Sequence, residues 1–272
     1  MAGPAPVREG FEAERFADWL PTSYWAISDE NMETVLTFNT TDFNHNLDSR
    51  YAVKIEYYEG KNEPVFRHCL TPDEIEDKNL RIRLADLRAQ YGLAKIDGMM
   101  LVSVRNESVG TPARPYYVTT WGTYLSADGK QVMSFPGQPI IGAEKSYRGF
   151  QVWPGAMADG TFETFIVLVN PFNRSQEYTA HLYDLNGNER IGRTLTIGRK
   201  FARRIALSEA VDDPAGHLAA TGGVGSLTVH SAYKIVLFGG AMNLKTGGCS
   251  GLDHFSPFLV PLGGTSQETF RE

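Results

Sequence analysis

Cysteine and histidine side chains lie close together at two places in the sequence, where they could bind a metal ion. His68 adjoins Cys69 in the first half of the chain. Cys249 precedes His254 by five residues in the second half. A zinc site would need both pairs to converge, with ligand distances of about 2.0–2.3 Å. Nothing in their spacing forces that convergence, and two cysteines are too few for a disulfide framework. We therefore predict two reduced thiols, no metal and no cofactor.

Asp253 and His254 could also act as an acid–base pair. Ser250 or Ser256 would then be the nucleophile. Neighbouring residues in a strand point to opposite faces, which argues against a cooperating pair. The chain also contains none of the GxxxxGK(S/T), GxSxG, HExxH, CxxC or EF-hand patterns. We predict that the protein is not an enzyme, and an enzyme with a site near Asp253 and His254 is the third of three functional hypotheses.

Aromatic side chains are the other residues suited to binding. Tyr117 and Trp121 alternate along one expected strand and therefore share a face. Tyr147 and Trp153 lie near the start of the second half. Exposed aromatic rings stack on sugars or pack against protein partners, because they bury a large area at little entropic cost. We predict these four as candidate binding residues; burial in a core is the competing and more frequent interpretation.

An amphipathic segment at the N-terminus is a candidate for holding a partner. Residues 8–20, REGFEAERFADWL, combine helix formers with apolar side chains, and Pro21 marks a common helix end. We predict a short helix within an N-terminal arm of residues 1–21. Phe16 and Trp19 would anchor this helix, either on its own sandwich or across a boundary between subunits.

The composition favours β-structure over helices. Among its 272 residues the chain has 27 Gly, 14 Pro, 12 Tyr and 15 Phe, which suits many turns and many strands. The length allows one large domain or two ordinary ones.

Charge and hydropathy argue against two classes of partner. The net charge of −6 and the pI of 5.6 give no global basic field for a phosphate backbone, so we expect no nucleic-acid binding. No run approaches the roughly 18 apolar residues of a membrane span, so we expect no membrane insertion. The N-terminus has no signal-peptide pattern, which predicts a cytoplasmic protein, or an extracytoplasmic one if a signal peptide has been removed.

The two halves of the chain share an ordered series of residues. Glu-Thr opens a β-prone run in each half, and a tyrosine precedes a turn glycine by nine residues in each. The matched positions are Trp25 with Trp153, Glu33 with Glu163, Tyr51 with Tyr178, Ile55 with Leu182, and Gly60 with Gly187. Such a series predicts a tandem repeat whose matched residues superpose. Ile55 and Leu182 should then both be buried.

Each half contains short alternating runs separated by turn residues. We therefore predict an all-β fold of two tandem antiparallel β-sandwiches, jelly-roll-like in form, after the short N-terminal helix. The first sandwich is expected over residues 22–132, a linker over 133–149, and the second sandwich over 150–272.

Two local expectations concern the first half. The run LRIRLADL, residues 80–87, is expected to form a strand. Thr71 is followed by Pro72 and acidic residues, which predicts a one-turn helix in a loop that lengthens the first half relative to the second.

The runs YWAIS, METVLTFN, VKIEYYEGKNEPV and LRIRLADL occur in this order in the first half. Over residues 24–105 they resemble the sensory rhodopsin transducer family. The resemblance implies a jelly-roll-like sandwich that forms oligomers and binds a membrane photoreceptor or another signalling partner in the cytoplasm, without catalysis. The duplication, the acidic loop and the N-terminal arm depart from the family.

The leading functional hypothesis is a non-enzymatic binding or scaffold protein, in its specific form a signalling partner of a membrane receptor. A carbohydrate-binding module, or a module for surface or filament assembly, is the alternative. Sandwich edges must be shielded or paired, so we also predict a homo-oligomer, most simply a C₂ dimer. The expected partners are thus a protein, a second copy or a glycan.

Overall fold

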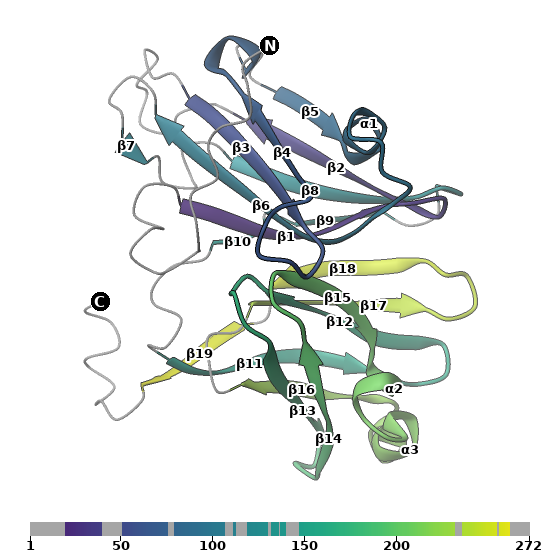
Figure 1. The fold of residues 1–272 in the computed structure, drawn as a ribbon. Helices are drawn as coiled ribbons and strands as arrows, with labels where there is room; N and C mark the ends of the chain where they lie inside the picture. Colours follow the sequence, from purple (N-terminus) through teal and green to yellow (C-terminus); the bar gives the residue numbers. More distant parts are fainter. Residues whose placement is uncertain are drawn as a thin grey trace.

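The structure, a computed structural model, is an all-β fold in which two β-sandwich units lie against each other (Figure 1). The predicted fold class is confirmed. Residues 1–19 of the predicted N-terminal arm, which include Phe16 and Trp19, are not among the described residues. Its last two residues, Leu20 and Pro21, belong to a strand and not to a helix. The structure describes residues 20–39, 51–75, 79–106, 111–112, 119–129, 132–135, 137–139, 147–231, 236–254 and 256–261.

The first unit consists of two layers joined at one corner. Strands β1 and β2 pair only at Ser28 and Glu33, so the connected strands fold over into two sheets. The β6 sheet contains, in order, β4 (Phe66–Leu70), β3 (Tyr51–Tyr58), β6 (Ile96–Asn106), β1 (Leu20–Ser28) and β10 (Gln138–Pro139), with the short β7 (Thr111–Pro112) beside β6. The β2 sheet contains β5 (Asn79–Arg83), β2 (Met32–Asn39), β8 (Thr119–Ser126) and β9 (Val132–Phe135).

The second unit repeats this strand order. A single bridge between Ala158 and Glu163 joins its layers, at the place where Ser28 and Glu33 pair in the first unit. The β16 sheet contains β14 (Glu189–Ile197), β13 (Gln176–Asp184), β16 (Val224–Ser231), β11 (Tyr147–Met157) and β19 (Ser256–Pro261). The β12 sheet contains β15 (Phe201–Ala206), β12 (Phe162–Asn170), β17 (Val236–Asn243) and β18 (Cys249–His254). Short helices α2 (Leu207–Ala210), α3 (Pro214–Leu218) and η3 (Ala219–Thr221) follow β15.

The matched glutamates have the same structural role in both units. Glu33 Oε1 accepts a hydrogen bond from the backbone N–H of Ala85 at 2.8 Å. Glu163 Oε1 accepts one from the backbone N–H of Ser208, also at 2.8 Å. Each carboxylate therefore satisfies a free N–H in the first turn of the helix that follows the outer strand. The predicted correspondence of Glu33 and Glu163 is confirmed.

The run LRIRLADL is not one strand. It ends as β5 at Arg83 and continues as helix α1 (Leu84–Gln90). Leu84 and Leu87 are both buried, at the three-residue spacing of one helix face, and Glu33 caps the helix start. The predicted one-turn helix after Thr71 is confirmed as η2 (Pro72–Ile75), where Thr71 Oγ1 donates to Glu74 Oε2 at 2.8 Å.

The predicted register of the repeat holds for burial but not for every pair. Ile55 and Leu182 are both completely buried, as predicted. In the ladders, however, Leu182 occupies the place of Tyr57, a shift of two residues that keeps the side chain on the same face. Trp25 and Trp153 do not superpose: Trp153 lies two residues farther from its glutamate than Trp25 does, and the bulge between Trp153 and Ala156 takes up only one of them, so Trp153 occupies the place of Tyr24.

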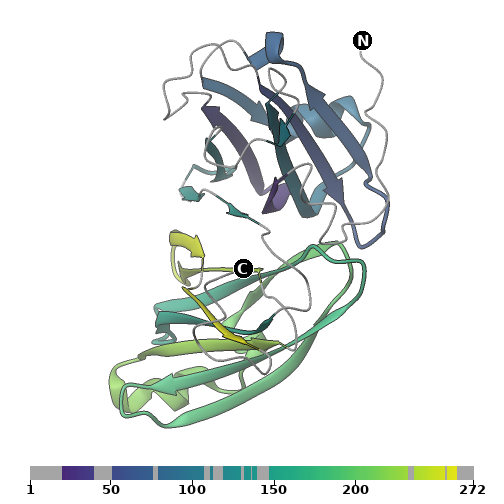
Figure 2. The same cartoon turned by 90° about the vertical axis from the view of Figure 1, so that its left-hand side faces the viewer.

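The two units are stacked so that the β12 sheet lies between the β16 sheet and the first unit (Figures 1 and 2). Strand β12 shows this most clearly. Phe165, Val167 and Val169 belong to the hydrophobic core of the first unit, whereas the alternating Ile166 and Leu168 belong to the core of the second. A strand covered on both sides is expected to be apolar throughout. One sheet of the second unit therefore completes both cores.

A buried lysine joins the units at their edge. The backbone N–H of Gly60 donates to the backbone O of Lys200 at 3.0 Å. Lys200 Nζ donates to Pro171 O at 2.6 Å and lies 5.3 Å from the centre of the Tyr58 ring. The segment 133–149, predicted as a linker, contains most of β9, all of β10 and the start of β11. Its extended runs form these strands because they pair with β8, β1 and β19, respectively.

Candidate functional site

The β2 sheet of the first unit and the β12 sheet of the second unit are equivalent, and each has one side that faces away from the other sheet of its own unit. We call this side the open face in the β2 sheet and the covered face in the β12 sheet, where the first unit packs against it. The correspondence follows from the ladders: Val35 lies opposite Arg83 and Thr123, and Phe165 lies opposite Ala206 and Gly240. The open face carries Val35, Thr37, Arg81, Arg83, Trp121, Thr123 and Leu125. The covered face carries, in the same order, Phe165, Val167, Arg204, Ala206, Phe238, Gly240 and Met242.

The two faces differ most in the exposure of one aromatic position. Trp121 is 41% exposed, whereas its counterpart Phe238 is completely buried under the first unit. Trp121 was predicted as a candidate binding residue, and its ring lies on the solvent side of the described structure. An exposed tryptophan is a common anchor in protein interfaces and sugar sites.

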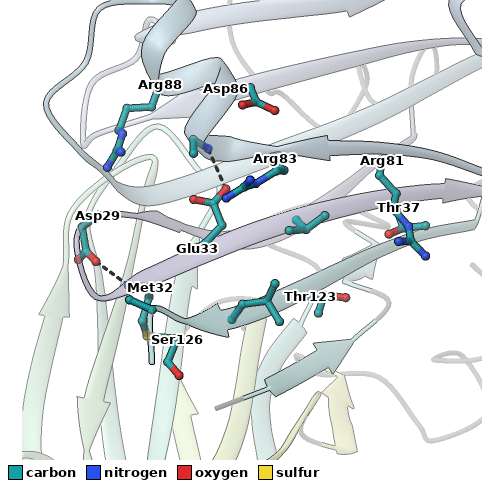
Figure 3. A pocket seen from close by; sticks show the side chains of 14 residues that line it. Asp29, Met32, Glu33, Thr37, Arg81, Arg83, Asp86, Arg88, Thr123 and Ser126 are labelled. Atoms are coloured by element: carbon teal, nitrogen blue, oxygen red, sulfur yellow. Dashed lines mark hydrogen bonds between the residues drawn. The ribbon is translucent and has the colours of Figure 1, made fainter. Parts of the chain in front are cut away.

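A groove of about 960 Å³ crosses the open face (Figure 3). It runs from the hairpin between β1 and β2 past helix α1 to strands β5 and β8. Three carboxylates and three guanidinium groups line it: those of Asp29, Glu33, Asp86, Arg81, Arg83 and Arg88.

Several of these charges are already used within the fold. Asp29 Oδ1 accepts hydrogen bonds from the backbone N–H groups of Asn31 and Met32 at 2.7 and 2.8 Å. Glu33 caps α1, and its Oε2 also accepts from Ser28 Oγ at 2.9 Å. Arg88 Nη1 donates to the backbone O of Ser28 at 3.2 Å. These three side chains hold the hairpin and the helix in place.

Arg81 and Arg83 are exposed and remain available. Both project from β5 onto the open face, opposite Thr37 and Val35 (Figure 3). Neither makes a hydrogen bond or an ion pair within the part of the chain that the structure describes. The groove therefore presents two adjacent guanidinium groups that can each bind a carboxylate or another planar anion.

The covered face shows how an arginine of this row behaves in a buried interface. Arg204 occupies the place of Arg81. Its Cζ lies 4.4 Å from the centre of the Phe165 ring, and its Nη2 donates to the sulfur of Met242 at 3.1 Å. A guanidinium group in this row can thus lie flat on an aromatic ring within a packed interface.

The other predicted binding residues do not join Trp121. Trp153 is half-buried and packs against the core of the second unit, so the interpretation as a core residue fits it. Tyr147 lies in β11, and its side chain is outside the described part of the structure. Tyr117, Phe16 and Trp19 lie outside the described residues.

The cysteines and histidines considered for metal binding have separate neighbours. Cys69 lies on β4 and Cys249 on β18, and both are free thiols. His68 meets the Tyr91 ring edge-on at 6.4 Å between ring centres. Burial raises the pKa of Cys249. Asp253 and His254 lie on β18, whose side chains beyond Cys249 are not described. Among the described residues no three potential ligands group as a metal site.

A polar cluster on the outer side of the β16 sheet was not predicted. The rings of His181 and His230 lie 4.2 Å apart. Glu189 Oε1 accepts from Tyr183 Oη at 2.5 Å and lies 2.8 Å from His181 Nδ1. These hydrogen bonds hold the pKa of Glu189 below its usual range, and burial, followed by the nearby His181, lowers the pKa of His230. The alternation of side chains along each strand is enough to place these residues on the outer face. That they lie next to one another depends on the pairing register of β13, β14 and β16, which the sequence pattern does not give.

Comparisons with known proteins add little. No model of a known protein family matches the chain, and no curated protein matches it. A cryo-EM structure of broad bean stain virus aligns with 97% of this chain and 89% of its own, at 12% identity and a TM-score of 0.20. Likeness at that level supports no inference about fold or function. No helix among the described residues is both long and apolar enough to cross a membrane.

Proposed function

We propose that the protein is a non-enzymatic binding or scaffold protein, and that the open face is where its first unit binds a protein partner. One observation carries the proposal: the same surface of the same sheet is a packed interface in the second unit, where Phe238 replaces the exposed Trp121. A sheet of this topology is therefore suited to packing against another protein layer.

The chemistry of the open face suits a separable partner better than a permanent one. It has Val35 and Thr37 where the covered face has Phe165 and Val167. It therefore exposes less apolar surface to water when unoccupied, and a single tryptophan provides the central contact. Interfaces that form and dissociate are more polar than permanent ones and commonly depend on a few aromatic and arginine residues.

The resemblance of residues 24–105 to the sensory rhodopsin transducer family supports a signalling role. In that specific form of the proposal, the partner is a membrane receptor or a protein that acts with it. The stacked second unit would hold the first unit rigidly, since Lys200 and the shared core leave little freedom between them.

The test compares captured partners across matched variants. Tagged wild-type protein, Trp121→Asp and Ile191→Asp would be incubated with lysate from the source organism and analysed by quantitative mass spectrometry. Ile191 is exposed on β14 and serves as the matched control. We expect at least one protein retained by wild type and by I191D and lost with W121D. Identical sets for all three proteins would rule out the open face as the binding surface.

Carbohydrate binding is the second candidate function, and it is supported at a different place. A shallow groove of about 490 Å³ on the second unit is lined by hydroxyl groups, including Thr179, Thr194 and Thr196, with His230 at one side. Hydroxyl groups and flat rings are usual features of sugar sites. Saturation-transfer NMR with a glycan mixture would detect binding that His230→Ala removes and Trp121→Asp does not.

A further inference from the structure

We infer that the partner of the open face is an acidic protein segment, whose carboxylates bind Arg81 and Arg83 while an apolar side chain packs on Trp121. This inference rests on the proposed function and specifies the chemistry of the partner.

The charge of the open face is the first step. Although the whole chain has a net charge of −6, the groups left available on this surface are mainly cationic. Asp29 and Glu33 are engaged by backbone N–H groups, and Asp86, in the first turn of α1, is the remaining lining carboxylate. Arg81 and Arg83 make no ion pair with any described residue. A partner that supplies carboxylates would form ion pairs with these two arginines, and a basic partner would be repelled.

The spacing of the groups indicates an extended acidic segment. Arg81 and Arg83 are two residues apart on β5, which separates them by about 6.8 Å along the strand. That is also the distance between alternate side chains of an extended peptide. Arg81, Thr37 and Trp121 form one row across three neighbouring strands, so Trp121 lies about 10 Å to the side of Arg81. Two acidic residues at positions i and i+2 match the two arginines, and an apolar residue beyond a bend in the segment would lie over Trp121.

A second copy of this chain fits the open face less well. Within the chain, the covered face packs against the outer side of the β6 sheet. Met99 and Leu101 alternate with the inward-facing residues of strand β6 and therefore lie on this outer side, and both are completely buried. The corresponding positions of the β16 sheet are Ser226 and Thr228. At these two positions, a second copy stacked in the same way would therefore bring hydroxyl groups to the open face, where the β6 sheet brings apolar side chains to the covered face. The exposed end of the stack is polar, as in the terminal units of repeat proteins.

The open face is also available without rearrangement of its two arginines. Both are exposed side chains at outward positions of β5, whose inward residue Ile82 is buried. Removing the guanidinium groups should leave packing unchanged, so variants at these positions report binding and not folding.

The experiment measures binding of labelled peptides by fluorescence anisotropy. The probes are an eight-residue peptide in which two Glu and one Leu occupy alternate positions separated by Ser, so that all three side chains can face the protein, and its counterpart with Lys in place of Glu. The proteins are wild type, the double variant R81A/R83A, the double variant R193A/R203A and W121A. Arg193 and Arg203 are exposed on the second unit, so the second double variant removes the same charge elsewhere.

We expect the Glu peptide to bind and the Lys peptide not to bind. R81A/R83A should weaken binding at least tenfold, W121A should weaken it by a smaller factor, and R193A/R203A should change it less than twofold. Binding should also weaken as salt is added, because exposed charges are screened. Equal losses in the two double variants, equal binding of both peptides, or no binding of the Glu peptide at about 1 mM would overturn the inference.

Two outcomes separate this inference from the proposed function. If captured proteins depend on Trp121 but the Glu peptide does not depend on Arg81 and Arg83, the open face binds a partner of other chemistry. If neither depends on the open face, both proposals fail. Concentration-dependent self-association that W121D abolishes in sedimentation experiments would instead identify a second copy as the occupant and would also overturn the acidic partner.

Discussion

The covered face and the open face are built from equivalent strands in the same order and register, and each sheet has a glutamate that caps the following helix. Their outward side chains nevertheless differ. Phe165, Val167 and Phe238 fill the contact with the first unit, whereas the half-buried Val35 and Thr37 and the exposed Trp121 occupy the same places on the open face. The topology of a sandwich therefore does not decide which outer surface is apolar. What lies against the sheet decides it. Trp121, the one large aromatic residue among the described residues of the open face, is the exception, and it suggests binding.

The largest effect is expected at the aromatic position that distinguishes the two faces. Phe238→Ala should lower the free energy of unfolding by about 3–5 kcal/mol, because it leaves a cavity in the core shared by both units. Trp121→Ala should lower it by less than about 1 kcal/mol, because the ring is largely outside the core. Denaturant unfolding of both variants measures the difference. Equal losses would mean that Trp121 is a core residue and that the open face is not open.

The two separate cores provide the next comparison. Ile55→Ala and Leu182→Ala should each cost about 2–5 kcal/mol, since both side chains are completely buried, one in each core. Hydrogen exchange should show the loss spreading beyond the mutated unit, because β12 contributes to both cores. Losses below about half a kcal/mol in both variants would contradict the inward placement of the repeated strands.

Burial could be predicted from the sequence better than pairing. Ile55 and Leu182 were placed correctly although their strands are shifted by two residues, because an even shift keeps a side chain on the same face. The bulge in β11 inserts a single residue between Trp153 and Ala156, and the rest of the strand pairs regularly. The spacing of the two tryptophans from their glutamates indicates this insertion only weakly.

The sequence also contains a signal for the stacking of the units. FIVLV, residues 165–169, is apolar without interruption, whereas VLTF, residues 35–38, is interrupted by a threonine. A continuous apolar run is typical of a strand covered on both sides. Which surface covers it depends on contacts between residues far apart in the chain. For that reason neither Arg81 and Arg83 nor the cluster around His181 and His230 could be assigned to a site from spacing alone.

The matched capping glutamates should give smaller effects, with the larger of the two at Glu33, whose Oε2 also accepts from Ser28 Oγ. Glu33→Ala and Glu163→Ala each remove the acceptor of a helix N–H and should each cost about 1 kcal/mol. Glu33→Gln and Glu163→Gln retain an acceptor oxygen and should cost less. Thermal unfolding of the four variants measures this. A loss at one glutamate only would mean that the two helix starts are not equivalent, even though each carboxylate accepts a backbone N–H at 2.8 Å.

The smallest effect on stability is expected when the covered face is transferred to the open face. Val35→Phe with Thr37→Val installs the side chains found at the same places in β12. Nothing in the described structure covers these positions, so the free energy of unfolding should change by less than about 0.5 kcal/mol. The larger apolar patch should instead increase self-association, which sedimentation at rising concentration detects. The control is Thr194→Val with Thr196→Val on β14, an exposed strand of the second unit. If V35F/T37V stabilises the protein by more than about 1 kcal/mol without self-association, a part of the chain already covers the open face, and the difference between the two faces is one of packing and not of exposure.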